Sequence, residues 1–212
     1  MEQGIILIDK PKGISSFDVI RQLRKKLGAK KMGHAGTLDP LASGLMIIGV
    51  GGATKKMFEY VGLSKVYETE VLLGRKTTTG DMEGDVVEAK KVLEIDNIEV
   101  KRVLKSMLGK VALFVPVYSA VKQGGVPLYK KARSGEDVAP PIKEMEIKSM
   151  ELLGSFKDGD CYVLKIVMEV GSGAYVRSIA EEIGRRLGVP ATVKELRRTR
   201  IGNFDIVDSE KL

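Results

Sequence analysis

One polar loop brings together residue types that acid–base or nucleophilic chemistry requires. Residues 33–44 read GHAGTLDPLASG and place an imidazole, His34, five residues before a carboxylate, Asp39. The glycines allow positive φ angles and a close approach of a ligand to the backbone, and Pro40 stiffens the chain directly after Asp39. The residues alone leave two interpretations open: an Asp-Pro turn beside a loop histidine, or a site in which Asp39 does chemistry.

The rare residue types limit this chemistry. One histidine and one cysteine, Cys161, among 212 residues exclude a zinc site built from cysteines and histidines. A serine–histidine–aspartate triad would have to use His34. The chain has neither a GxxxxGK[ST] nor a GxGxxG motif, so no nucleotide-binding loop is predicted. No metal or cofactor motif is therefore visible, and we expect carboxylates, tyrosines and basic groups to carry most of any catalysis.

Positive charge is concentrated in three stretches of the chain. The formal net charge is +7, yet residues 21–31 hold six bases and no acid, and residues 122–133 hold four bases and no acid. Residues 185–200 hold six bases with a single acid, Glu195. One such run often only solvates a helix, but three of them are typical of a surface that faces phosphates. We expect RNA or DNA as the partner and no membrane contact.

The sequence shows no sign of membrane insertion or export. No apolar run approaches the roughly 18 residues of a membrane span, and residues 1–10 (MEQGIILIDK) lack the basic start and cleavage site of a signal peptide. A single cysteine cannot form an intramolecular disulfide, which is typical of a reducing compartment. These features predict a cytoplasmic protein.

Strands and helices are mixed along the chain without strict alternation. Hydrophobic patterns and flanking turn residues predict strands near residues 4–9, 45–50, 66–73, 85–89, 111–115, 161–170 and 196–206. Helical spacing predicts helices near residues 16–27, 54–62, 97–108 and 176–187. We expect the first helix to be capped by Ser15 or Ser16 and to bury Phe17. The mixture favours an α+β fold around a largely antiparallel mixed sheet, in one domain over residues 1–212.

The loop at residues 33–44 closely resembles the catalytic motif of the TruB-type tRNA pseudouridine synthases. Other blocks resemble the family in the family's own order and cover nearly the whole chain: residues 9–16 (DKPKGISS), 65–68 (KVYE), 116–122 (PVYSAVK), 171–178 (GSGAYVRS) and 196–202 (LRRTRIG). This family isomerises uridine 55 in the T-loop of tRNA. The resemblance implies the pseudouridine-synthase fold, an antiparallel sheet flanked by helices and RNA-binding loops.

The resemblance assigns the catalytic roles to three residues. Asp39 would be the essential aspartate, Arg177 its ion-pair partner, and Tyr67 the side chain that lines the pocket against a flipped base. An arginine within about 4–6 Å keeps a carboxylate charged despite burial. The reaction breaks a C–N bond and forms a C–C bond without net redox change, so no cofactor is implied.

Four further residues are implied in substrate binding. His34 would occupy the space that the flipped base leaves in the RNA stack, and Leu196 would pack under the uracil. Asp81 would help to hold the arginine, and Lys10 belongs to the block that resembles the family's opening KPxG motif. The segment at about 116–141, which contains a basic stretch, resembles the family's RNA-clamping insertion.

Three departures from the family pattern stand out. Residues 76–79 read KTTT where the family usually has RTDT, so one acid is missing near Asp81. The double proline before the Tyr-Ser-Ala block is reduced to Val115-Pro116. The sequence stops soon after Ile206, where relatives commonly continue into an RNA-binding domain such as PUA, and we expect no PUA domain here.

The resemblance favours an enzyme that acts on the T-arm stem-loop of tRNA as a monomer without an obligate protein partner. Two alternatives remain: a guide-RNA-dependent pseudouridine synthase subunit of a small ribonucleoprotein, and a non-catalytic RNA-binding module. Turnover of tRNA by the protein alone distinguishes the first function from these two alternatives.

Overall fold

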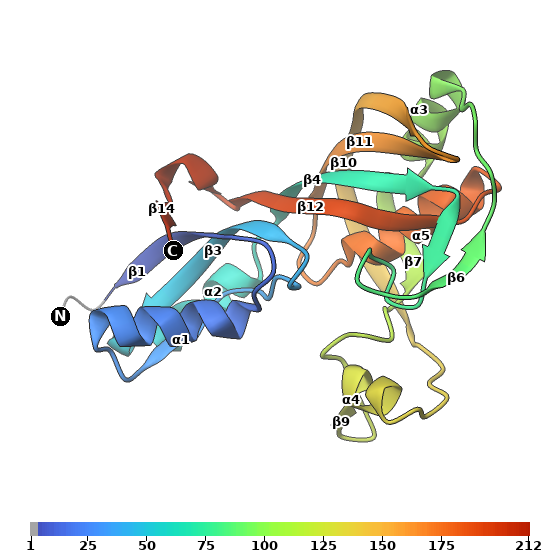
Figure 1. The fold of residues 1–212 in the computed structure, drawn as a ribbon. Coiled ribbons are helices and arrows are strands. Elements are labelled where there is room, and N and C mark those ends of the chain that lie inside the picture. Colours follow the sequence, from blue (N-terminus) through green and yellow to red (C-terminus); the bar gives the residue numbers. More distant parts are fainter. Residues whose placement is uncertain (1–3) are drawn as a thin grey trace. The chain divides into compact units, whose positions relative to one another are not determined.

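The computed structural model describes residues 4–212, and the chain divides into two compact units. The first unit comprises Met1–Thr69, Val167–Ser172 and Glu195–Leu212, and the second comprises Glu70–Ile166 and Gly173–Lys194. Three strands cross these boundaries: β4 (Lys65–Leu73), β11 (Cys161–Val170) and β12 (Ala191–Ile201) (Figure 1). The single catalytic domain over residues 1–212 stays a prediction.

The first unit is built on the strand order β14-β1-β3-β12-β4. β1 (Ile5–Lys10) pairs antiparallel with β3 (Ser43–Val50) and parallel with β14 (Glu210–Lys211), while β12 runs parallel to β3. Two short strands add to it: β2 (Met32–His34) pairs with β3, and β13 (Phe204–Asp205) with β12. The helices are α1 (Ser16–Leu27) and α2 (Met57–Val61), with 3-10 turns at Gly51–Lys56 and Ile206–Asp208.

Helix α1 begins where the sequence indicates, but it buries a different face. Ser15 is the N-cap and forms a reciprocal capping box with Asp18, and Gly28 ends the helix at φ 62°. The buried residues are Ser16, Val19, Ile20 and Leu23. Phe17, which we expected on the buried face, is 60% exposed. The buried face of α1 is rotated from the predicted one toward Ser16, because the Ser16 hydroxyl forms buried hydrogen bonds with Leu38 in the loop at residues 33–44.

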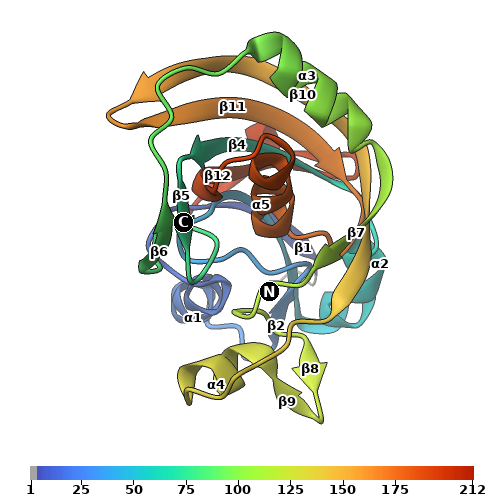
Figure 2. The same cartoon turned by 90° about the vertical axis from the view of Figure 1, so that its right-hand side faces the viewer.

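The second unit has the strand order β4-β11-β10-β7. β10 (Ile142–Asp158) pairs antiparallel with β7 (Gly109–Phe114), and β5 (Arg75–Thr77) forms a separate hairpin with β6 (Val86–Ala89). The helices are α3 (Asn97–Ser106) and α5 (Val176–Arg186). Figure 2 shows the segment at 116–141 as a small hairpin of β8 (Lys122–Gln123) and β9 (Val126–Pro127) followed by α4 (Leu128–Arg133).

Two long strands differ from the sequence analysis: one was missed and one was misplaced. The 17-residue strand β10 was not predicted, because only Met145 and Ile147 along it are buried and its sequence therefore lacks a continuous apolar alternation. The last long strand was predicted at 196–206 but runs over Ala191–Ile201. It ends there because Gly202, at φ 54°, reverses the chain into β13.

The apolar strand β3 supplies much of the first unit's core. Leu45 and Ile47 are completely buried and pack with Ala35, Met57 and Ile201. Ala35 opens the loop at 33–44, and its N–H donates to the Ile47 carbonyl at 3.0 Å. The first residues of the loop that carries Asp39 are therefore hydrogen-bonded to a fully packed strand, β3, and do not lie on a solvated surface.

Candidate active site

The loop that carries Asp39 is held on both sides of the carboxylate. Before it, the hydroxyl of Ser16 donates to the Leu38 carbonyl at 2.9 Å and accepts from the Leu38 N–H at 2.8 Å. After it, the Gly13 N–H donates to the Pro40 carbonyl at 2.9 Å. Asp39 itself is half-buried. A partly exposed carboxylate on a fixed backbone is the arrangement that a reacting group requires.

Lys10 ties the first turn of the chain to this loop. Its ammonium donates to the carbonyls of Pro11 at 2.9 Å, Ile14 at 2.7 Å and Pro40 at 3.4 Å. The residue has no exposed surface. In this structure Lys10 holds the backbone of the loop next to Asp39, and its contact with substrate stays a prediction.

Two buried cations lie beneath the same loop. Arg198, 1% exposed, donates through Nε to the Leu45 carbonyl at 2.7 Å and through Nη2 to the Gly36 carbonyl at 3.2 Å. Lys65 donates to the carbonyls of Val61 and Leu63, both at 2.6 Å. Burial, with a further contribution from the charge of Arg198, lowers the pKa of Lys65 to about 8.

Sequence reasoning missed both cations as site residues and counted Arg198 among bases that face phosphates. A signal was present, since strand periodicity places Arg198 on the same face as Leu196. At Gly36, where φ is +92°, a Cβ would lie 3.5 Å from Arg198 Nη1 and 3.8 Å from Lys65 Cε. The loop therefore approaches the two cations closely because Gly36 has no side chain.

Tyr67 and Leu196 share one face of the sheet. They lie on the neighbouring strands β4 and β12 and are 8% and 7% exposed. Each is two residues from a buried cation, Lys65 in β4 and Arg198 in β12, and side chains two apart in a strand point to the same side. Because both cations lie against Gly36, Tyr67 and Leu196 are on the side of the sheet on which the loop lies.

His34 ends β2 and belongs to the same group. Burial lowers the pKa of its imidazole, the charge of Arg198 lowers it further, and a backbone hydrogen bond with Gly36 partly opposes both. The ring is therefore neutral at neutral pH. His34, Asp39, Tyr67 and Leu196 all belong to the first unit, and their assembly into one site stays a prediction.

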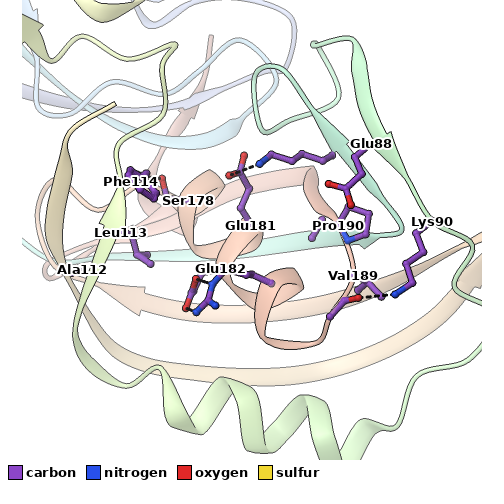
Figure 3. Close-up of a pocket in the computed structure, with 14 residues that line it drawn as sticks. Glu88, Lys90, Ala112, Leu113, Phe114, Ser178, Glu181, Glu182, Val189 and Pro190 are labelled. Carbon is purple, nitrogen blue, oxygen red and sulfur yellow. Dashed lines mark hydrogen bonds and ion pairs between the residues drawn. The ribbon is translucent and has the colours of Figure 1, made fainter. Parts of the chain in front are cut away.

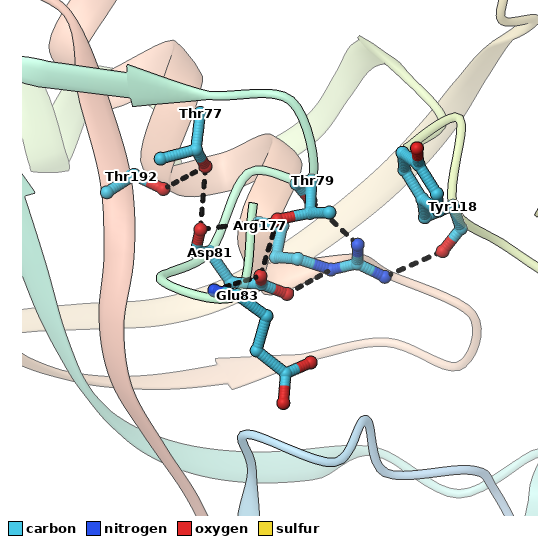
Figure 4. Close-up of polar contacts among 7 residues, drawn as sticks. All are labelled: Thr77, Thr79, Asp81, Glu83, Tyr118, Arg177 and Thr192. Carbon is cyan, nitrogen blue, oxygen red and sulfur yellow. Dashed lines mark hydrogen bonds and ion pairs between the residues drawn. The ribbon is translucent and has the colours of Figure 1, made fainter. Parts of the chain in front are cut away.

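The second unit contains the other predicted residues, Arg177 and Asp81. Arg177 lies in the first turn of α5 and is 6% exposed. Its guanidinium donates to the Thr79 carbonyl at 2.8 Å and to the Tyr118 carbonyl at 3.0 Å, and its Nε is 3.8 Å from Asp81 Oδ2 (Figure 4). Asp81 therefore faces the arginine as expected. Asp39 belongs to the first unit, and its ion pair with Arg177 stays a prediction.

The missing acid of the KTTT stretch does not remove a partner of Arg177. Thr78 stands where relatives usually have an aspartate, and it is exposed. Its hydroxyl accepts from the Asp85 N–H at 3.2 Å across a surface turn. The acid that faces Arg177 across this turn is Asp81.

Most bases of the third stretch, residues 185–200, form ion pairs within the protein. Arg185 pairs with Glu182 of its own helix, and three further bases pair with acids of other segments: Lys194 with Asp158, Arg197 with Asp9 and Arg200 with Glu169. By contrast, exposed lysines of the other two stretches form no ion pair within residues 4–212, namely Lys25, Lys26, Lys30, Lys31, Lys122 and Lys130. The phosphate-facing role that we expected of all three stretches stays a prediction, and the unpaired lysines lie in the stretches at 21–31 and 122–133.

A pocket of about 630 Å³ lies in the second unit, beside the helix that carries Arg177 (Figure 3). None of the predicted site residues lines it. Two of its charged residues are Glu181 and Lys76, whose charged groups are 4.0 Å apart. Burial raises the pKa of Glu181, while the charges of Lys76 and Arg177 oppose that rise. The pocket's charges thus compensate one another.

Comparison with known families decides the identity of the fold. Residues 24–176 match the model of the TruB family pseudouridylate synthase N-terminal domain, and residues 177–212 match that of the tRNA pseudouridylate synthase B C-terminal domain. The chain belongs to the TruB family. The resemblance in the loop at 33–44 is therefore confirmed across the chain. In the part of the chain that the structure describes, no helix is long and apolar enough to cross a membrane.

Several bacterial TruB relatives are similar over nearly the whole chain. A protein of Endomicrobium trichonymphae named tRNA pseudouridine synthase B is 39% identical over 97% of this chain and 88% of its own length. The protein of the same name from Fusobacterium nucleatum is 42% identical over 96% of this chain and 69% of its own length. The chain spans 64% of the relative from Xanthomonas euvesicatoria, which is 38% identical over 95% of this chain.

Solved structures confirm the predicted fold class. The structure of a Cbf5-Nop10-Gar1 complex contains a chain that aligns with a TM-score of 0.73 and 26% identity, over 99% of this chain and 52% of that one. The chain thus spans about half the length of the solved chain that it matches. The shared architecture is a mixed, mostly antiparallel sheet flanked by helices, as the sequence predicts for this TruB protein.

Proposed function

We propose that this protein is a tRNA pseudouridine synthase that converts uridine 55 of the T-loop to pseudouridine. The observation that carries the proposal is the family's catalytic loop with Asp39 half-buried between two fixed residues, Leu38 and Pro40. Relatives about 40% identical over nearly the whole chain bear the name tRNA pseudouridine synthase B. The protein is thus an isomerase.

The chemistry needs one bond broken and one formed within a single nucleotide. The C1′–N1 bond breaks, the uracil rotates, a C1′–C5 bond forms, and the proton lost from C5 is balanced by one gained at N1. The target base must first leave the RNA stack, which costs a few kcal/mol. A neutral His34 ring suits the vacated space, because an imidazole can stack and hydrogen bond without carrying charge.

The reacting base would lie against Tyr67 and Leu196. Both side chains are largely buried on the face on which the loop lies, so a uracil placed there would be shielded from water. Asp39 would act on the ribose or on the base as nucleophile or as base. Arg177 would keep Asp39 ionised and oriented, since a planar guanidinium fixes a carboxylate better than an ammonium does.

The finer features of the substrate and partners belong to the same proposal. The protein would bind the T-arm stem-loop with the unpaired lysines of stretches 21–31 and 122–133, and would act as a cytoplasmic monomer without an obligate protein partner. A second candidate is a guide-RNA-dependent subunit, which the likeness to a chain from the Cbf5-Nop10-Gar1 complex favours. The names of the bacterial relatives favour the first.

One assay separates these functions. Purified protein alone is incubated with unmodified tRNA, and pseudouridine is mapped by position. We expect modification at position 55 and none in a tRNA that carries cytidine there. No turnover without an added guide RNA and partner proteins would favour the second candidate, and no turnover under any condition would favour a non-catalytic RNA-binding module.

A further inference from the structure

The turn that faces Arg177 contains three consecutive threonines whose hydroxyls have different surroundings. Thr77 is buried, and its hydroxyl donates to the Asp81 carbonyl at 2.7 Å and lies 3.0 Å from the Thr192 hydroxyl. The hydroxyl of Thr78 accepts from the Asp85 N–H at the surface. Thr79 alone donates to the Asp81 carboxylate, at 2.6 Å to Oδ1 (Figure 4).

Thr79 contacts the arginine group through two separate atoms. Its carbonyl accepts from Arg177 Nη1 at 2.8 Å, while its hydroxyl holds the carboxylate of Asp81. Asp81 Oδ1 also accepts from the Glu83 N–H at 3.1 Å, and Oδ2 is the oxygen that faces Arg177 Nε at 3.8 Å. With two donors on Oδ1, the carboxylate is oriented so that Oδ2 points to the guanidinium.

The position of the Thr79 hydroxyl is fixed by a close approach of the backbone. A Cβ on Gly84 would lie 2.5 Å from Thr79 Oγ1, so only glycine allows the turn to close over this hydroxyl. Gly80, at φ +76°, lies on the other side, and a Cβ there would lie 3.3 Å from Arg177 Cβ. Two glycines thus pack the turn closely around Thr79 and the arginine.

We propose that Thr79 is a positioning residue for catalysis, which orients Arg177 both directly and through Asp81. The proposal rests on the proposed function, since Arg177 is there assigned to act on the catalytic aspartate. A hydrogen bond to a charged group contributes more than one between neutral groups. Loss of the Thr79 hydroxyl would let the Asp81 carboxylate rotate, and Arg177 would lose its defined orientation before the protein lost its fold.

The test compares Thr79→Val with Thr78→Val, which removes a neighbouring hydroxyl that has no contact with Asp81 or Arg177. Wild-type turnover of tRNA first establishes the proposed function independently. We expect Thr79→Val to lower kcat at least about tenfold, with KM for tRNA within about twofold. Thr79→Ser, which restores the hydroxyl, should recover kcat to within about threefold, and Thr78→Val should match the wild type.

A double-mutant cycle with Asp81→Asn shows whether the effect passes through the carboxylate. We expect Thr79→Val to cost little further activity once Asp81 is asparagine. Losses that simply multiply, or a Thr79→Val enzyme as fast as Thr78→Val, would overturn the proposal. If valine lowers the melting temperature, Thr79→Ala removes the same hydroxyl without the added methyl, and the same comparison with Thr78→Ala applies.

Discussion

Ser16 holds Leu38 by both its N–H and its carbonyl, through one buried hydroxyl at 2.8 and 2.9 Å. Leu38 directly precedes Asp39, so a serine in the first helix fixes the backbone of the proposed catalytic loop. The adjacent Ser15 caps the helix instead. Of these two neighbouring serines, Ser15 thus stabilises the start of helix α1 and Ser16 stabilises the loop that carries Asp39.

Replacing Ser16 with alanine should lower both stability and turnover. The substitution leaves the Leu38 N–H and carbonyl without their partner in a buried place, a cost of about 1–3 kcal/mol. Ser15→Ala is the matched control, because loss of an N-cap costs about 1 kcal/mol without touching the loop. Thermal melts and kcat on tRNA give the comparison: both variants melt lower, and only Ser16→Ala loses kcat. Equal kcat in the two variants would contradict the role of Ser16.

Replacing Asp39 with asparagine should abolish turnover but not binding. The amide keeps the size of the side chain and removes the negative charge that attacks carbon or accepts a proton. We expect no detectable pseudouridine and a tRNA affinity within about tenfold, or roughly 1.4 kcal/mol, of the wild type. Turnover at a rate comparable to the wild type would disprove the assignment.

Arg177→Lys should be nearly as damaging as removal of the arginine. The guanidinium reaches the Thr79 and Tyr118 carbonyls with separate nitrogens and presents Nε to Asp81. A lysine carries the same charge on one nitrogen and cannot keep this geometry. Single-turnover rates should fall by at least about tenfold, with tRNA affinity little changed. A lysine variant that retains most of its rate would show that charge alone suffices.

The unpaired lysines and the paired arginines should respond differently to salt. Lys25→Ala and Lys130→Ala should each reduce the slope of log affinity against log salt by up to about 1, because each removes a phosphate contact. Arg197→Ala should leave the slope unchanged, since Arg197 pairs with Asp9 at 2.7 Å. Binding titrations at several salt concentrations measure the slope. If only Arg197→Ala changed the slope, the third stretch would contact phosphates and the lysines of the other two stretches would not.

Lys65 should make stability depend on pH above neutrality. Its pKa is about 8 in the folded chain against an ordinary 10.5, so the unfolded chain binds more protons between these values and the free energy of unfolding rises with pH across that window. Below pH 8 the buried Lys65 ammonium is charged, and the free energy of unfolding is lowered by the full cost of burying that charge. Lys65→Met removes this dependence. Melting temperatures from pH 7 to 10 should therefore rise for the wild type relative to the variant, and a constant difference would refute the assignment.

The sequence by itself determined the elements whose residues alternate or recur strongly, and the loop that carries the chemistry. The cap and bounds of helix α1 follow from local residue pattern, although its buried face does not. The strand with Tyr67 follows from its alternation, and strand β3 from its continuous apolar run. The loop at 33–44 was identified by its residue types and its likeness to the TruB motif. These features depend on neighbours in the chain.

Only the tertiary structure decided which charges face solvent and which hold the site. Nothing in the sequence marks Arg198 and Lys10 as buried, yet Arg198 is buried on the carbonyls of Leu45 and Gly36, and Lys10 on those of Pro11, Ile14 and Pro40. The long strand β10 leaves little apolar pattern, and its place is set by pairing with β7. Thr79 differs from Thr78 only in which residues lie opposite it. The partners of Arg198 and of β10, and Arg177 beside Thr79, are distant in sequence, and composition carries no record of them.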